Sequence, residues 1–337
     1  MADAIESRTI EILAGADAGT EIPVTTFRGA HPGPVLALIA GNHGYEYPPI
    51  LALQQLRGQI QPALLHGTVI MVHVANMPSF LGRTIYFSPV DGKNLNRCYP
   101  GNPDGTVSER IAHAITTQVI EPADYVLDLH CGDGNESLRP YVYQTVTGDA
   151  RLDAAIGELA LAFGIGYILV DRNRPTDAAR SIYCSTTAIT RGKPAMTIEC
   201  GYLGMSDSVS IQQIVSGVRG VMRHLKMLED GPAPIANAVY LDPFVDILSP
   251  ATGILYPEVE RAQVISKGKL LARITDFFGN PIATVESPIA GRVLYIVATP
   301  PITTGQPIAC VAAPRVTGTP RPTGTPRANQ TYLAPRD

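Results

Sequence analysis

Two histidines and a glutamate lie where apolar segments give way to loops, and these residue types bind catalytic metals. His43 and Glu46 occur in GNHGYEYPPI, directly after the apolar run VLALIA. His130 ends a second apolar run, YVLDLH, and is followed by CGDG. Two histidines and one glutamate leave a fourth coordination position of zinc open, as hydrolytic chemistry requires. The residues therefore predict one zinc ion per chain; the alternative is that each is only a hydrogen-bonded residue near a strand end.

These three residues can converge only if the strands that carry them are neighbours in one sheet. Residues 35–40 are short and continuously apolar, which indicates a buried strand, and YVLDLH (125–130) is a further predicted strand. The same patterns predict further strands at 68–76 and 194–200, and helices from about residue 46 and at 107–120, 152–163 and 209–229. Strands alternating with helices favour a largely parallel α/β sheet covered on both faces. In such folds ligands bind beyond the carboxyl ends of the strands.

The chain divides by composition into three predicted parts. Residues 1–235 carry the strand and helix pattern and form the expected hydrolase domain. Residues 236–315 contain an internal repeat, SPATGILYP with ISKGKLLARI and then SPIAGRVLYI with ITTGQPIACV, which predicts a small two-fold β-barrel or sandwich. Residues 316–337 are rich in Pro, Thr, Gly and Arg, and we expect this tail to be disordered.

Composition narrows the class of partner. Hydrophobic residues make up 45% and charged residues 17% of the 337 residues, and the net charge is -4, so nothing points to nucleic acid or an anionic membrane. No signal peptide or membrane span is predicted. Five cysteines without CxxC spacing favour reduced thiols and a cytoplasmic location. A small-molecule substrate is the expected partner, and a homo-oligomer is compatible with the sequence.

Four motifs in a fixed order give the sequence a family resemblance over about residues 30–230. They are GNHGYE, the loop NMPSFLGRTIYFSPVDGKNLNRCYPG, DLH and IECG. The chain resembles the succinylglutamate desuccinylase/aspartoacylase family, which is related to the zinc carboxypeptidases. The resemblance implies a three-layer α/β/α domain with a mostly parallel or mixed sheet. It also implies a zinc-dependent deacylase that hydrolyses the amide bond of an N-acyl amino acid or a similar small substrate with a carboxylate.

The same resemblance assigns roles to further residues. Glu199 would be the general base that takes a proton from water, a task suited to a partly buried carboxylate near a cation. Arg83 would polarise the scissile carbonyl and stabilise the oxyanion. Asn96 and Arg97 would hold a substrate carboxylate, because a guanidinium group pairs with both carboxylate oxygens.

One position departs from the family pattern. Many relatives have an aspartate where this chain has Asn94, so an acidic partner for a metal-binding histidine is missing there. Either the Asn94 amide oxygen or Asp128, on the same strand face as His130, is expected to orient a ligand. The C-terminal repeat resembles the biotinyl/lipoyl hammerhead fold but lacks the tripeptide around a modified lysine, which favours a structural or gating role.

Two other functions are compatible with the residues. One is a metallocarboxypeptidase acting on peptides, which would need an open cleft. The other is a small-molecule binding protein without catalytic activity. Specificity is expected in residues 172–191 and 201–208, where several arginines suggest an anionic substrate: Arg172, Arg174, Arg180 and Arg191.

Overall fold

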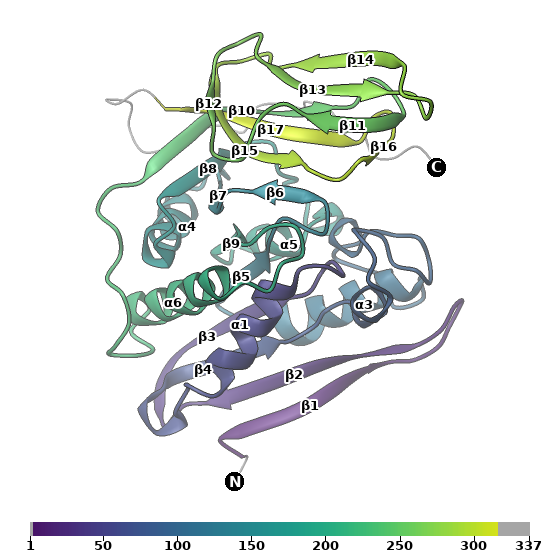
Figure 1. Ribbon diagram of the computed structural model, residues 1–337. Helices are drawn as coiled ribbons and strands as arrows, with labels where there is room; N and C mark the ends of the chain where they lie inside the picture. Colours follow the sequence, from purple (N-terminus) through teal and green to yellow (C-terminus); the bar gives the residue numbers. More distant parts are fainter. Residues whose placement is uncertain (1–2, 316–337) are drawn as a thin grey trace.

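A computed structural model describes residues 3–315, in which one long mixed sheet forms the centre of the molecule (Figure 1). The first strands are β1 (Ile5–Ile12), β2 (Thr20–Arg28), β3 (His31–Ala40), β4 (His66–Val72), β5 (Tyr125–His130), β6 (Glu136–Leu138), β7 (Tyr141–Thr145), β8 (Tyr167–Asp171) and β9 (Ala195–Glu199). The later strands are β10 (Val239–Leu248), β11 (Gly253–Pro257), β12 (Val264–Ile265), β13 (Leu270–Thr275), β14 (Pro281–Glu286), β15 (Gly291–Val297), β16 (Pro301–Ile302) and β17 (Pro307–Pro314).

The order of strands in this sheet is β1-β2-β4-β3-β5-β9-β7-β8-β10-β17-β15-β12, with β6 paired to β15. Strand β3 pairs in parallel with both β4 and β5, and β5 pairs in parallel with β9. Strands β1 and β2 form an antiparallel hairpin, and β7 runs antiparallel to β9. The mixed α/β sheet with a C-terminal all-β region confirms the predicted fold class.

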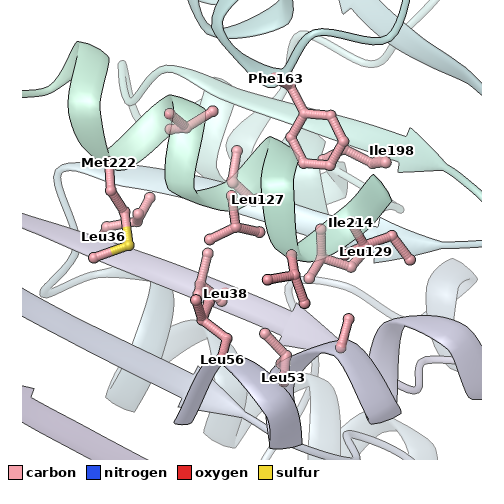
Figure 2. Packing of buried hydrophobic residues seen from close by; sticks show 14 of the residues in the cluster. Leu36, Leu38, Leu53, Leu56, Leu127, Leu129, Phe163, Ile198, Ile214 and Met222 are labelled. Atoms are coloured by element: carbon pink, nitrogen blue, oxygen red, sulfur yellow. The ribbon is translucent and has the colours of Figure 1, made fainter. Parts of the chain in front are cut away.

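Helices cover both faces of the sheet. They are α1 (Tyr47–Arg57), α2 (Met77–Gly82), α3 (Val107–Ile115), α4 (Ala150–Phe163), α5 (Cys184–Ile189) and α6 (Ser208–His224), with the short turns η1 (Pro62–Leu64), η2 (Leu95–Arg97), η3 (Thr116–Ile120) and η4 (Ala178–Arg180). Figure 2 shows α1 and α6 packing on β3 and β5 through buried Leu53, Leu38 and Leu127. Helices α3 and α5 pack on the opposite face in a second apolar cluster. Burial on both faces explains why the central strands are continuously apolar.

Local signals placed the ends of several helices correctly. The Thr106 backbone amide and hydroxyl both donate to Glu109 Oε2 at the start of α3, as the capping spacing predicts. Gly164 follows α4 with φ +83°, a conformation that glycine adopts without steric cost. The helix predicted to reach residue 120 does so, but its last turn is the π-helical segment η3.

The sequence patterns predict no element at β1, β2, β6, β7 or β8. Strand β1 lies at the edge of the sheet and buries only Ile10 and Ile12, so its apolar pattern is weak. Strands β7 and β8 are five residues each, too short for periodicity to separate them from loops.

The C-terminal region shows the two-fold repeat in its hydrogen bonds. Ser249 Oγ donates to the carbonyl of Ala251, and Ser287 Oγ donates to the carbonyl of Ile289, both at 2.7 Å. A second sheet, β14-β13-β11-β16, packs against β10, β17 and β15 around a separate apolar cluster. Because β10 pairs with β8, the main sheet contains strands from both sides of residue 235. The predicted boundary between two domains at this residue stays a prediction.

Three further observations concern the rest of the chain. The five cysteines all lie within the described residues and all are free. Across residues 3–315, every helix is too short or too polar to span a lipid bilayer. The predicted disordered tail, 316–337, lies outside the described residues.

Candidate metal centre

Three potential metal ligands meet at the carboxyl edge of the sheet. His43 and Glu46 lie in the loop between β3 and α1, and His130 is the last residue of β5. Because β3 and β5 pair in parallel, both segments leave the sheet at the same edge. One ligand atom from each of the three residues lies within 4.8 Å of the others, and all three side chains are buried.

The Glu46 carboxylate joins the two histidines. Its Oε1 lies 2.9 Å from His43 Nδ1 and 2.9 Å from His130 Nδ1. Burial opposes its ionisation, but His130 and His43 outweigh burial and lower the pKa of Glu46 to about 2. Its other oxygen, Oε2, is buried and has no hydrogen-bond partner within the described residues. Two imidazoles, an ionised carboxylate and an unpartnered carboxylate oxygen fit a divalent cation.

The outer ring nitrogen of each histidine has an oxygen partner of its own. His43 Nε2 lies 3.1 Å from Asn94 Oδ1, and His130 Nε2 lies 2.9 Å from Asp128 Oδ1. Asp128 also accepts a hydrogen bond from Asn42 Nδ2 at 2.8 Å. When a cation takes the place of the protons between the rings and Glu46, an oxygen partner keeps a proton on Nε2 and leaves the Nδ1 lone pair as a ligand. The sequence offered Asn94 and Asp128 as alternatives, and the structure places each beside a different histidine.

Glu199 stands opposite His130. The two residues are register partners in β9 and β5, so their side chains share one sheet face, here called the site face. Burial raises the pKa of Glu199 well above its usual value, and Glu46 and Glu136 add to this rise while His130 opposes it. A carboxylate with a raised pKa beside a candidate metal centre has the chemistry of a general base.

Asn96 and Arg97 lie in η2, next to the cluster. Asn96 Nδ2 is 3.4 Å from His130 Nε2, and Asn96 Oδ1 accepts a hydrogen bond from the Cys184 amide at 2.9 Å. The Arg97 guanidinium lies over the Tyr183 ring, 4.6 Å from its centroid, and its side chain is exposed. Arg97 Nη1 donates to the Asn96 carbonyl at 2.8 Å, and the other N–H groups of the exposed guanidinium can meet a carboxylate that arrives from solvent.

Arg83 occupies a more peripheral position. It follows α2 with φ +50°, and its backbone amide donates to the carbonyl of Phe80 at 3.3 Å. Its side chain is exposed and makes no hydrogen bond or salt bridge with another of residues 3–315. Burial and Tyr45 raise the pKa of Tyr47 at the start of α1, and the charge of Arg83 opposes that rise. The structure thus brings Arg83 near the loop that holds Glu46, but not into contact with the three ligands.

Several polar residues of the site were missed in the sequence. Tyr86 Oη lies 2.5 Å from Glu136 Oε1, and the Tyr86 ring meets the His43 ring edge-on. Burial is the main cause that raises the pKa of Glu136 to about 7 and that of Asp133 to about 6. Asp133 follows His130 within CGDG, so its place after a strand could have indicated it. No local pattern indicated Tyr86.

Three of the four arginines that suggested an anionic substrate form salt bridges, and Arg180 is the exception among residues 3–315. Arg174 Nε lies 2.5 Å from Asp171 Oδ2, and Arg172 Nη2 lies 3.3 Å from Asp242 Oδ2. Arg191 forms a salt bridge with Glu121 at 3.7 Å. Their charges therefore do not by themselves select an anionic substrate.

Comparisons with known proteins agree with this geometry. A family model described as the succinylglutamate desuccinylase/aspartoacylase catalytic domain matches residues 32–225. A protein of Halomonas elongata named N-alpha-acetyl-L-2,4-diaminobutyric acid deacetylase is 34% identical over 271 residues, which cover 79% of this chain and 77% of that protein.

Two solved structures share the fold over nearly the whole chain. A succinylglutamate desuccinylase from Silicibacter sp. TM1040 superimposes with a TM-score of 0.82 at 25% identity, covering 93% of this chain and 96% of the other. The product-bound ectoine utilization protein EutE (DoeB) from Ruegeria pomeroyi superimposes with a TM-score of 0.81 at 27% identity, with the same coverage of 93% and 96%.

Proposed function

The chain belongs to the succinylglutamate desuccinylase/aspartoacylase family, and on this premise we propose that it is a zinc-dependent deacylase. Its substrate would be an N-acylated amino acid or a similar small molecule that carries a carboxylate. The observation that carries the proposal is the convergence of His43, Glu46 and His130 with Glu199 opposite His130 on the site face. The family resemblance predicted from the sequence is confirmed.

We propose that one zinc ion per chain is held by His43 Nδ1, His130 Nδ1 and Glu46. The unpartnered Oε2 of Glu46 and the oxygen partners on both outer ring nitrogens support this donor set. A bound zinc ion supplies Lewis-acid polarisation of the amide carbonyl and makes water more acidic.

The remaining steps are carried by side chains of this protein. Glu199 takes a proton from the attacking water and later gives it to the leaving nitrogen. Arg97 binds the substrate carboxylate with its exposed guanidinium, while Asn96 positions η2 through its bond to the Cys184 amide. Arg83 would stabilise the oxyanion, which requires its side chain to turn inward from its exposed position.

An acetyl group is the acyl group that we propose first. The relative from Halomonas elongata is named for removal of an acetyl group from an amino acid, and this chain matches most of that protein's length. Strand β6 follows His130 closely and pairs with β15, so the C-terminal region lies against the site segment. That arrangement favours a small substrate over a peptide. The five free cysteines agree with a cytoplasmic location, which we retain as part of the proposal.

The test combines metal content with turnover. Zinc would be measured in the purified protein and in Glu199→Ala, together with amine release from N-acetyl, N-succinyl and N-formyl amino acids. We expect near-stoichiometric zinc in both proteins and turnover only in the unmutated one. Protein that binds no zinc, or a Glu199→Ala variant with full activity, would contradict the mechanism. Zinc binding without turnover of any substrate would favour the binding-protein alternative.

A further inference from the structure

The site face continues from the candidate metal centre toward the C-terminal region. Tyr141 of β7 is the register partner of Glu199, so both side chains lie on the site face. Tyr143, two residues along β7, lies on the same face, and its hydroxyl is 3.3 Å from that of Tyr141. Tyr143 pairs with Leu169 of β8, and Leu169 pairs with Leu241 of β10.

Strands β10, β17 and β15 extend this face further. Asp246 of β10 is the partner of Cys310 in β17, and Cys310 is the partner of Tyr295 in β15. Cys310 and Tyr295 pack in one buried cluster with Tyr141. Asp246 therefore stands on the site face, although it comes from a strand that follows the predicted boundary at residue 235. Its neighbours Val245 and Ile247 point the other way, into the apolar cluster of the C-terminal region.

Asp246 has no salt-bridge partner among residues 3–315, although a carboxylate next to a buried apolar cluster usually has one. It accepts a hydrogen bond from the Tyr295 hydroxyl at 3.3 Å, keeps contact with solvent, and forms no salt bridge with residues 3–315. Burial raises the pKa of Asp246, and Arg174, whose charge opposes this rise, forms a salt bridge with Asp171 at 2.5 Å. By contrast, Asp242 on the same strand is paired with Arg172.

Electrostatic coupling joins Asp246 to the catalytic end of the face. Burial raises the pKa of Tyr143 well above its usual value, and the charges of Asp246 and Glu199 add to that rise. Tyr143 thus lies near both carboxylates. A carboxylate flanked by the aromatic rings of Tyr143 and Tyr295 provides the two features that recognise an organic cation.

We propose that Asp246 is a specificity-determining residue that binds a positively charged ammonium group on the substrate side chain. The inference rests on the proposed deacylase function and deepens it, since the substrate class becomes N-acyl amino acids with a basic side chain. The amide bond would lie at the zinc site and the side chain would reach along the site face past Tyr143. Selectivity would then come from a strand of the C-terminal region, while the chemistry stays on β3, β5 and β9.

Two substrates of equal shape and different charge test this proposal. Nα-acetyl-L-2,4-diaminobutyrate ends in an ammonium group, and Nα-acetyl-L-norvaline has a methyl group in its place. In the unmutated protein we expect kcat/KM for the charged substrate to exceed that for the uncharged one by roughly 100-fold. In Asp246→Asn this preference should fall by about 30-fold, mostly through a higher KM for the charged substrate. Asp246→Glu should restore part of the preference.

Asp242→Asn is the matched control, because it removes a carboxylate of the same strand that already has a cationic partner, and it should keep the full preference. Equal loss on both substrates in Asp246→Asn would assign Asp246 a structural role and overturn the proposal. So would an unmutated protein without charge preference.

Binding separates this proposal from the proposed function. If neither substrate is deacylated, calorimetry with the products L-2,4-diaminobutyrate and L-norvaline still decides. A preference for diaminobutyrate that disappears in Asp246→Asn would support the proposal even though the deacylase assignment had failed. Equal binding of the two products would overturn it.

Discussion

The two ends of the site face differ in how their acidic side chains are paired. At the end formed by β5 and β9, the acids beside the two histidines are paired with them: Glu46 Oε1 lies 2.9 Å from both Nδ1 atoms, and Asp128 Oδ1 lies 2.9 Å from His130 Nε2. At the end formed by β10, β17 and β15, the residues are mainly apolar or aromatic, and Asp246 is without a salt bridge to residues 3–315. In the proposed function, the first end would hold a cation and transfer protons. The second end would contribute to substrate selection without contacting the reacting atoms.

The largest effect should come from the paired end. His130→Ala removes one ligand and leaves the Glu46 carboxylate buried with a single histidine, so we expect zinc to be lost. Turnover should fall by roughly 10,000-fold, equivalent to about 5 kcal/mol of activation free energy. Metal analysis and kcat/KM check both. His113→Gln, in α3, should change neither. Retained zinc with normal turnover in His130→Ala would remove this end from the reaction.

Packing should dominate the C-terminal region. Leu271 is fully buried in its apolar cluster, and Leu271→Ala should lower the free energy of unfolding by about 2–5 kcal/mol. Urea unfolding measures this loss, and kcat below the unfolding transition should stay within about twofold. Leu64→Ala, at an exposed position, is the control and should cost less than about 0.5 kcal/mol. A large loss of kcat in the folded Leu271→Ala variant would mean that the two ends are not separable.

The oxygen partners of the histidines allow a finer test. Asp128→Asn weakens the acceptor for His130 Nε2, and we expect zinc affinity to fall by about 10- to 100-fold. Asn94→Asp supplies a charged acceptor to His43 Nε2 and should raise zinc affinity. Competition with a chelator measures both changes. If the two variants change affinity in the same direction, these contacts do not tune the metal.

The smallest effect tests the symmetry of the repeat. Ser249→Ala and Ser287→Ala remove equivalent 2.7 Å hydrogen bonds. Each should cost about 1 kcal/mol of unfolding free energy, and the two costs should agree within about 0.5 kcal/mol. Thermal unfolding of both variants checks this. Strongly unequal costs would show that contact with the main sheet outweighs the repeat.

Buried strands and helix ends could be predicted from the sequence, because both depend on residues that are close together in the chain. Residues 35–40, which precede His43, are continuously apolar, and the Thr106 and Glu109 spacing marks a helix start. The motif residues His43 and Glu46 could be recognised because strand ends are where polar side chains gather. Strands β7 and β8 were not predicted, because five residues each carry too little periodicity to indicate a strand.

The remaining residues of the site could not be predicted, because their positions depend on contacts between segments far apart in the chain. Asp246 reaches the site face only because β10 joins β8 and β17, a pairing between segments far apart in the chain. Tyr86 contacts Glu136 from a loop in which it adopts φ +60°, a conformation that no neighbouring residue signals. The sequence also could not show which arginines are paired. Arg174 forms a salt bridge with Asp171, and Arg172 forms one with Asp242.

The pairing of β6 with β15 has a consequence for synthesis on the ribosome. Strand β6 emerges immediately after His130, but its partner, Gly291–Val297, is translated much later. Until then Glu136, which meets Tyr86 beside His43, belongs to a strand without its hydrogen-bonded neighbour. The nascent chain can assemble β3, β5 and β9 first. The acidic side chains around the candidate metal centre are all in place only when the last strands have been made. A truncated product would therefore carry His43, Glu46 and His130 but lack the finished site.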